Sequence, residues 1–193
     1  MPKVTEQHRA SRREQITLAA LRTFATKGVQ RATMADIVAE SGLSAGAIYG
    51  HFDSKEALTL AAAEYVLSEQ ARHVRKRDTG RGLSPSDTLT SLIEGVGGVD
   101  PSLFLQFWGE ATMDEGIRST FAASLGPLRS SFETVIARWA RDHPEVTSDP
   151  QLFAQHTLRV LLGLMQGYLV QQAMYNDFDR DAYLRTARAL LPN

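Results

Sequence analysis

Apolar residues recur along the chain at the spacing of α-helices. Ile16, Ala20 and Phe24 lie four positions apart between Gln7 and Lys27, which places them on one helix face. No stretch keeps the strict apolar–polar alternation of a half-buried strand. The pattern predicts an all-α fold of about nine helices, expected over residues 7–27, 33–41, 44–50, 53–77, 86–98, 101–113, 115–142, 149–174 and 179–191.

Residues that cap helices support the starts of three of these ranges. Thr33 precedes the second range with Asp36 three positions on, the spacing of a capping box. Ser44 is placed to cap the third helix. Asp53, with Glu56 three residues later, is expected to cap the fourth. A helix, a short helix, a turn containing glycine and a second short helix form a helix-turn-helix.

One proline falls inside a predicted helix. Pro127 follows Gly126 in the 115–142 range. Proline removes a backbone hydrogen bond and clashes with the preceding turn, so we expect a kink or a break at this point.

The third predicted helix has little side-chain bulk on one side. Ile48 and Phe52 share the side that would anchor it to the first two helices. The opposite side carries short residues and one aromatic: Ala45, Gly46, Tyr49 and Gly50. A helix that enters the major groove of DNA must fit a width of about 12 Å, and small residues allow that approach.

Positive charge is concentrated at the start of a chain whose net charge is −1. Residues 1–31 hold two acidic residues, Glu6 and Glu14, and seven basic ones: Lys3, Arg9, Arg12, Arg13, Arg22, Lys27 and Arg31. This surplus favours a polyanionic partner at that end of the chain. A solvated helix face is the alternative interpretation, and charge alone does not separate the two.

The stretch FATKGVQRATMADIVAESG, followed directly by LSAGAIYGHFDSKEAL, resembles the DNA-binding domain of TetR-family transcriptional regulators. The resemblance covers residues from about 10 to 60. It implies a helix-turn-helix DNA-binding domain over 1–53 and a helical effector-binding and dimerisation domain over 54–193. The helix over 54–77 would link the two domains. The implied function is a ligand-responsive regulator, most often a repressor, that binds a double-stranded operator.

The resemblance also implies which residues contact DNA. Those matching backbone-contacting positions are Thr33, Ser44, Tyr49, His51 and Lys55, and those matching base-facing positions are Ala45, Gly46 and Ala47. Ala45 replaces a frequent Lys or Arg, and Gly50 replaces a frequent aromatic or His, so direct base contacts should be few. Arg31, the N-terminal arm or DNA shape would then add specificity. As alternatives, Thr33 and Ser44 could act only as caps, and His51 could be a half-buried imidazole.

Aromatic residues in the second half of the chain suggest a cavity for an apolar or aromatic effector. The candidate lining residues are Phe104, Gln106, Trp108, Glu110, His156 and Gln166. Aromatics at helical spacing also occur in ordinary cores, which is the competing interpretation. By the resemblance, a homodimer would pair the later half of 115–142 and the 149–174 helix, where Gly163 and Gly167 allow close approach.

Composition narrows the remaining function classes. The chain has no cysteine, which excludes disulfides and thiolate metal sites. Neither a signal peptide nor a stretch long enough to cross a membrane is evident, so we expect a cytoplasmic protein. The histidines form no recognised metal spacing, and motifs for phosphate-binding loops or nucleophile elbows are missing. We therefore expect no enzyme activity and no cofactor. An all-helical enzyme or a protein-interaction bundle is the alternative.

Overall fold

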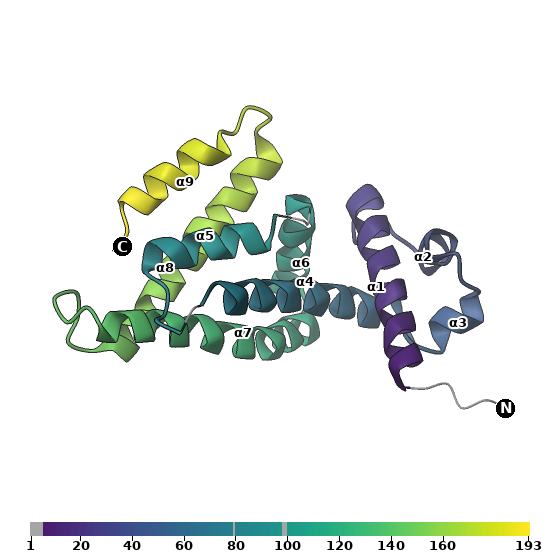
Figure 1. Ribbon diagram of the computed structural model, residues 1–193. Helices are drawn as coiled ribbons and strands as arrows, with labels where there is room; N and C mark the ends of the chain where they lie inside the picture. The colour runs from purple at the N-terminus through teal and green to yellow at the C-terminus, as the bar shows by residue number, and fades with distance from the viewer. Residues whose placement is uncertain (1–5, 79, 98–99) are drawn as a thin grey trace. The chain divides into compact units, whose positions relative to one another are not determined.

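The computed structural model describes residues 6–78, 80–97 and 100–193 (Figure 1). All regular secondary structure within these ranges is helical, which confirms the predicted all-α fold. The nine helices of the described ranges are α1 Glu6–Lys27, α2 Met34–Ser41, α3 Ala45–Tyr49, α4 Lys55–Arg77, α5 Pro85–Gly95, α6 Pro101–Met113, α7 Glu115–Arg141, α8 Pro150–Met174 and α9 Arg180–Ala189.

Three details of the predicted helices were wrong. The cap of α4 is Ser54 and not Asp53, because the Ser54 side chain accepts a hydrogen bond from the Ala57 amide at 3.2 Å. α3 is shorter than expected and consists of five residues. α7 continues through Pro127, so the predicted break was wrong, while the alternative of a kink at this point stays a prediction. Proline removes one backbone donor, and the next side chain, Leu128, is buried.

Contacts divide the chain into two compact units. Unit 1 contains the described residues up to Tyr65 together with Gln106–Phe121, and unit 2 contains the described residues of Val66–Leu105 together with Ala122–Asn193. The predicted domain boundary between residues 53 and 54 stays a prediction.

Unit 1 is built around the helix face that the sequence pattern predicted. Ile16, Ala20 and Phe24 of α1 are fully buried. α1 packs against α2, and α2 contacts α3, so the three helices lie next to one another (Figure 1). Ile37 of α2 and Ile48 of α3 complete this core, and both side chains are fully buried.

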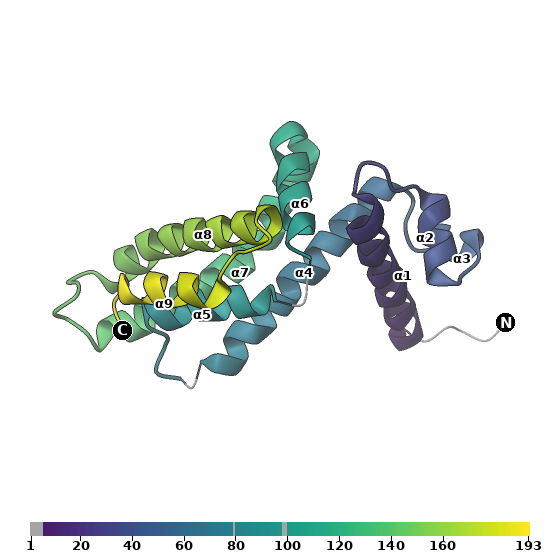
Figure 2. The same ribbon diagram turned by 90° about the horizontal axis from the view of Figure 1, so that it is seen from above.

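Unit 2 is centred on α8, which packs against α5 and α9 (Figure 2). Tyr168 of α8 is buried, and its ring contacts those of Phe178 and Tyr183 edge-on at centroid distances of 5.3 and 5.5 Å. Of the helices in the described part of the chain, not one is both long and apolar enough to cross a bilayer.

Candidate nucleic-acid interface

The start of α2 is fixed by a complete capping box. The Thr33 hydroxyl accepts a hydrogen bond from the Asp36 amide at 3.2 Å, and the Asp36 carboxylate accepts one from the Thr33 amide at 3.0 Å. Lys27 forms a 2.6 Å ion pair with Asp36. The hydrogen bond from Lys27, followed by those from Thr33, lowers the pKa of Asp36 to about 2. The predicted cap is confirmed, and a phosphate contact by exposed Thr33 stays a prediction.

The turn between α2 and α3 requires a glycine. Gly42 has φ 67°, the left-handed conformation that residues with a Cβ rarely adopt. Ser44 then caps α3, and its hydroxyl accepts a hydrogen bond from the Ala47 amide at 3.2 Å. The predicted cap at Ser44 is therefore confirmed.

The two sides of α3 differ in burial. Ile48 is fully buried and Phe52, just beyond the helix, is 2% exposed, so these side chains anchor the inner side. On the outer side Ala45 and Gly46 are exposed, and Tyr49 is 50% exposed. A Cβ added to Gly46 would meet no atom within 4 Å. The outer side is thus a narrow open surface that the rest of unit 1 does not cover.

Arginines of α1 border the end of α3. Arg13 donates a hydrogen bond to the His51 carbonyl at 3.1 Å, and its guanidinium lies 4.2 Å from the centre of the Phe52 ring. Partial burial lowers the pKa of His51, and the positive charges of Arg9, Arg13 and Arg12 lower it further. Sequence reasoning did not include these arginines among the site residues, although the basic surplus at the chain start indicated them.

The side chains of Lys55 and Arg31 both donate hydrogen bonds to backbone carbonyls shortly before α2. The Lys55 ammonium donates to the carbonyls of Val29 at 3.2 Å and Gln30 at 3.1 Å. An ammonium has three N–H groups, so one remains for a phosphate. Arg31 is exposed, and its Nε donates to the Lys27 carbonyl at 3.0 Å.

All ten predicted DNA-contact residues belong to unit 1. Those on α3 and its flanking positions form one surface and are exposed or, for Ala47 and His51, partly exposed: Ser44, Ala45, Gly46, Ala47, Tyr49, Gly50 and His51. The structure thus brings small residues, helix caps and basic groups together. This combination suits the close approach of a phosphate backbone.

Residues 16–62 match the family model for bacterial regulatory proteins of the tetR family. These residues therefore carry a TetR-family domain.

Two curated relatives extend this assignment. The chain is 36% identical over 104 residues to the uncharacterised HTH-type transcriptional regulator YfiR of Bacillus subtilis, covering 53% of this chain and 51% of YfiR. It is 48% identical over 63 residues to the HTH-type transcriptional repressor Rv1474c of Mycobacterium tuberculosis, covering 33% of this chain and 34% of that repressor. The chain thus matches about half or less of the length of these TetR-type relatives.

A solved structure supports the fold. FadR from Bacillus subtilis, crystallised with stearoyl-CoA, aligns with a TM-score of 0.72 over 92% of this chain and 96% of FadR. At 14% sequence identity, this likeness shows the fold alone.

The six predicted effector-pocket residues do not all lie in one place. Glu110 lines a pocket of unit 1, while Gln106 accepts a hydrogen bond from the Val29 amide at 2.6 Å. The other four differ in exposure: Phe104 is buried, Trp108 is partly exposed, and His156 and Gln166 are exposed on α8. A shared effector site for these six stays a prediction.

Proposed function

We propose that this TetR-family chain is a DNA-binding transcriptional regulator that inserts α3 into the major groove. The observation that carries the proposal is the outer side of α3, where Gly46 has open space around it and Tyr49 is half exposed. Neither packing nor backbone conformation requires a glycine at position 46. A glycine at this position would allow the helix backbone to lie close to a DNA duplex.

Phosphate contacts would fix the position of α3 in the groove. We assign them to exposed or partly exposed polar residues around α3: Thr33, Ser44, Tyr49, His51 and Lys55. Ala45, Gly46, Ala47 and Gly50 would face the bases and offer little hydrogen bonding, so Arg31 and DNA shape would carry much of the specificity. The arginines near His51 add positive potential for the same backbone.

A homodimer would present two such helices to a palindromic operator, with half-sites about 34–36 Å apart. The support comes from α8, which leaves a row of exposed positions at helical spacing: Leu152, His156, Val160, Gly163, Val170 and Met174. The later half of α7 offers less apolar surface, because Phe132, Ile136 and Trp139 are already buried in unit 2. We therefore favour α8 as the main pairing helix.

Ligand response and repression complete the proposal. The relative Rv1474c is named as a repressor, and FadR was crystallised with stearoyl-CoA. By analogy, a small apolar or aromatic effector would release this regulator from its operator. Such release requires that the effector bind the two conformations with different affinities. An all-helical enzyme or an interaction bundle without DNA binding is the rival function.

Selection of bound fragments from the source genome, followed by gel shift, tests the proposal. We expect enrichment of palindromic fragments that the wild-type chain binds and Tyr49→Ala binds weakly. Tyr49 is half exposed, so this variant should fold normally. If no sequence is enriched, or if Tyr49→Ala binds as tightly as wild type, the result contradicts DNA binding through α3 and favours the rival function.

A further inference from the structure

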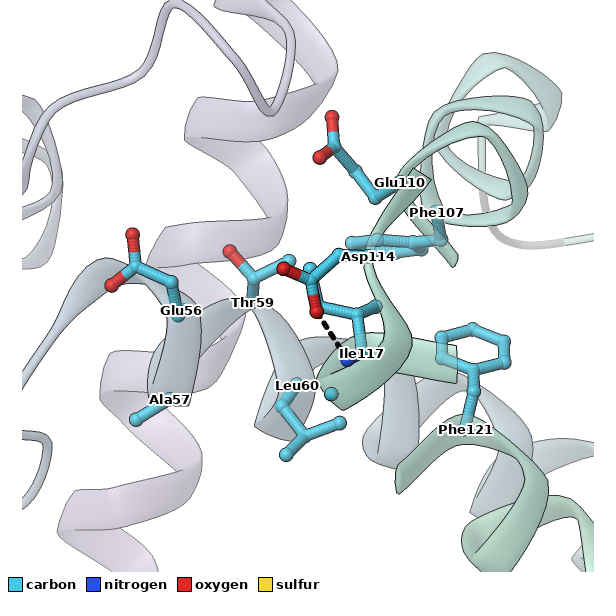
Figure 3. Close-up of a pocket in the computed structure, with 10 residues that line it drawn as sticks. Glu56, Ala57, Thr59, Leu60, Phe107, Glu110, Asp114, Ile117 and Phe121 are labelled. Atoms are coloured by element: carbon cyan, nitrogen blue, oxygen red, sulfur yellow. Dashed lines mark hydrogen bonds between the residues drawn. The ribbon is translucent and has the colours of Figure 1, made fainter. Parts of the chain in front are cut away.

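A pocket of about 320 Å³ lies within unit 1 (Figure 3). It is bordered by the first turns of α4, the last turns of α6 and the first turns of α7. The lining residues are Glu56, Ala57, Thr59, Leu60, Phe107, Glu110, Asp114, Gly116, Ile117 and Phe121. The volume is at the lower end of the range for small-molecule sites.

The aromatic part of this pocket is held rigidly by the core. Phe107 and Phe121 are 3% and 7% exposed, and their ring centroids lie 6.5 Å apart. Phe24 of α1 meets Phe107 edge-on at a centroid distance of 6.4 Å. The apolar surface is therefore formed before any ligand arrives, which lowers the entropy cost of binding.

The pocket carries negative charge without a cation in its lining. Three carboxylates border it, those of Glu56, Glu110 and Asp114, and none of its lining residues is Lys, Arg or His. Asp114 accepts a hydrogen bond from the Ile117 amide at 2.8 Å, and Glu110 accepts one from the Gln30 side-chain amide. Both of these partners are neutral, so neither hydrogen bond neutralises the carboxylate that accepts it.

Glu56 also stays ionised at neutral pH. Its pKa is lowered by a hydrogen bond from its own backbone amide, then by one from Ser54, and to a smaller extent by the charge of Lys55. The carboxylate thus adds to the negative potential at the edge of the pocket.

Thr59 adds a polar group without a partner. It is 6% exposed, it lines the pocket, and its hydroxyl has no hydrogen bond to any described residue. Thr17, Thr23 and Thr90, the other buried threonines shown with bonds, each donate to the carbonyl four residues earlier. Among the described residues, the fully buried side-chain atoms without a partner are the hydroxyls of Thr88 and Ser91, so the Thr59 hydroxyl is accessible from the pocket and can bond a ligand there.

We propose that this pocket binds a protonated amine carried on an aromatic or branched apolar body. The body packs on Phe107 and Phe121, and the ammonium lies among the carboxylates of Glu110 and Asp114 and donates to the Thr59 hydroxyl. An aromatic face also attracts a cation directly. The inference deepens the proposed ligand response and rests on it only for the effect on DNA.

A contact of Glu110 also connects the pocket to the helix-turn-helix. Glu110 accepts a hydrogen bond from Gln30, which lies in the turn before α2. A bound ammonium competes with Gln30 for that carboxylate, and one of the bonds that hold this turn is lost. Lys55 and Gln106 hydrogen-bond to the neighbouring backbone of the same turn. Loss of the Gln30 bond therefore changes a turn whose other contacts are defined.

Isothermal titration calorimetry of the full chain without DNA, at neutral pH, tests the pocket. The probes share one ring and differ in charge: 2-phenylethylamine, 2-phenylethanol and 3-phenylpropanoate. We expect the amine to bind at least about tenfold more tightly than the alcohol, since both can donate a hydrogen bond but only the ammonium forms a charge pair with the carboxylates. Equal affinities, preference for the anion, or no binding of the amine up to its solubility limit would overturn the proposal.

Isosteric variants locate the site. Glu110→Gln and Asp114→Asn keep their neutral hydrogen-bond partners but remove charge, and each should weaken amine binding about three- to fivefold. Thr59→Val should weaken it by a similar factor. Gln30→Ala should strengthen it, because Glu110 no longer has another partner. Glu145→Gln, an exposed acid outside the pocket, serves as the charge-matched control and should change nothing.

Thermal unfolding of each variant confirms that it folds. Wild-type amine affinity in folded Glu110→Gln, Asp114→Asn and Thr59→Val together would place the amine elsewhere and refute the site. A chain that binds the amine here but binds no DNA would uphold the pocket and refute the proposed function instead.

Discussion

The two short helices of the helix-turn-helix, α2 and α3, differ in how far folding explains their residues. In α2, the capping box of Thr33 and Asp36 and the ion pair with Lys27 account for the polar residues at its start. In α3, only Ser44 and Ile48 have such roles. On the outer side of α3, Gly46 has open space around it and Tyr49 is half exposed, so folding gives little reason for these residues.

The glycines of α2 and α3 differ in the same way, because folding requires one and not the other. Gly42 after α2 has a positive φ, so the turn requires it. Gly46 in α3 has no positive φ and no close neighbour. A residue that costs helix stability and serves no internal contact points to a role outside the chain.

Substitution of the α3 anchor should give the largest loss of stability. Ile48→Ala removes a fully buried side chain and should lower the free energy of unfolding by about 2–5 kcal/mol. Its neighbour on the outer side, Tyr49→Ala, should stay within about 0.5 kcal/mol of wild type. Urea denaturation measures both, and similar losses for the two variants would contradict the distinction between the two sides of α3.

Substitutions of Gly42 and Gly46 should change the stability of the fold in opposite directions, and by less than Ile48→Ala does. Gly42→Ala forces a Cβ into the left-handed region and should cost about 1–2 kcal/mol. Gly46→Ala should be neutral or stabilise the fold by up to about 1 kcal/mol, because alanine favours the helix. Thermal unfolding compares them, and a clear loss of stability in Gly46→Ala would reveal a folding role for this glycine.

The capping box of α2 predicts a pH effect. The pKa of Asp36 is lowered from 3.8 to about 2, so its ionised form stabilises the folded state above about pH 3.8. That contribution is lost as the pH falls from 3.8 towards 2, where the folded-state carboxylate takes up its proton. Asp36→Asn should lack this loss in acid denaturation curves, whereas Glu145→Gln, which retains Asp36, should keep it.

Sequence reasoning predicted features that depend on neighbours along the chain. The buried stripe of Ile16, Ala20 and Phe24 follows from helical spacing, and the caps at Thr33 and Ser44 follow from local hydrogen bonding. The cap of α4 was misassigned by one residue, because Asp53 and Ser54 are both good caps and sequence spacing favoured the former.

Features that depend on distant parts of the chain were not predicted. Lys55 was expected to contact phosphate, and its hydrogen bonds to two carbonyls of a turn 25 or more residues earlier were not anticipated. The pocket around Thr59 likewise needs α4 and α6 to meet. Helical periodicity shows which face of each helix is apolar, but it does not show which helices share a boundary.

The most direct test of the account is operator binding by Gly46→Leu, measured by fluorescence anisotropy on a fragment selected from the source genome. The matched control is Gly109→Leu, at an exposed glycine of α6 that also has open space around it. We predict that both variants fold, that Gly109→Leu binds like wild type, and that Gly46→Leu loses at least about tenfold in affinity because the added side chain holds the helix away from the groove. Wild-type affinity in a folded Gly46→Leu would contradict the claim that the outer side of α3 contacts DNA.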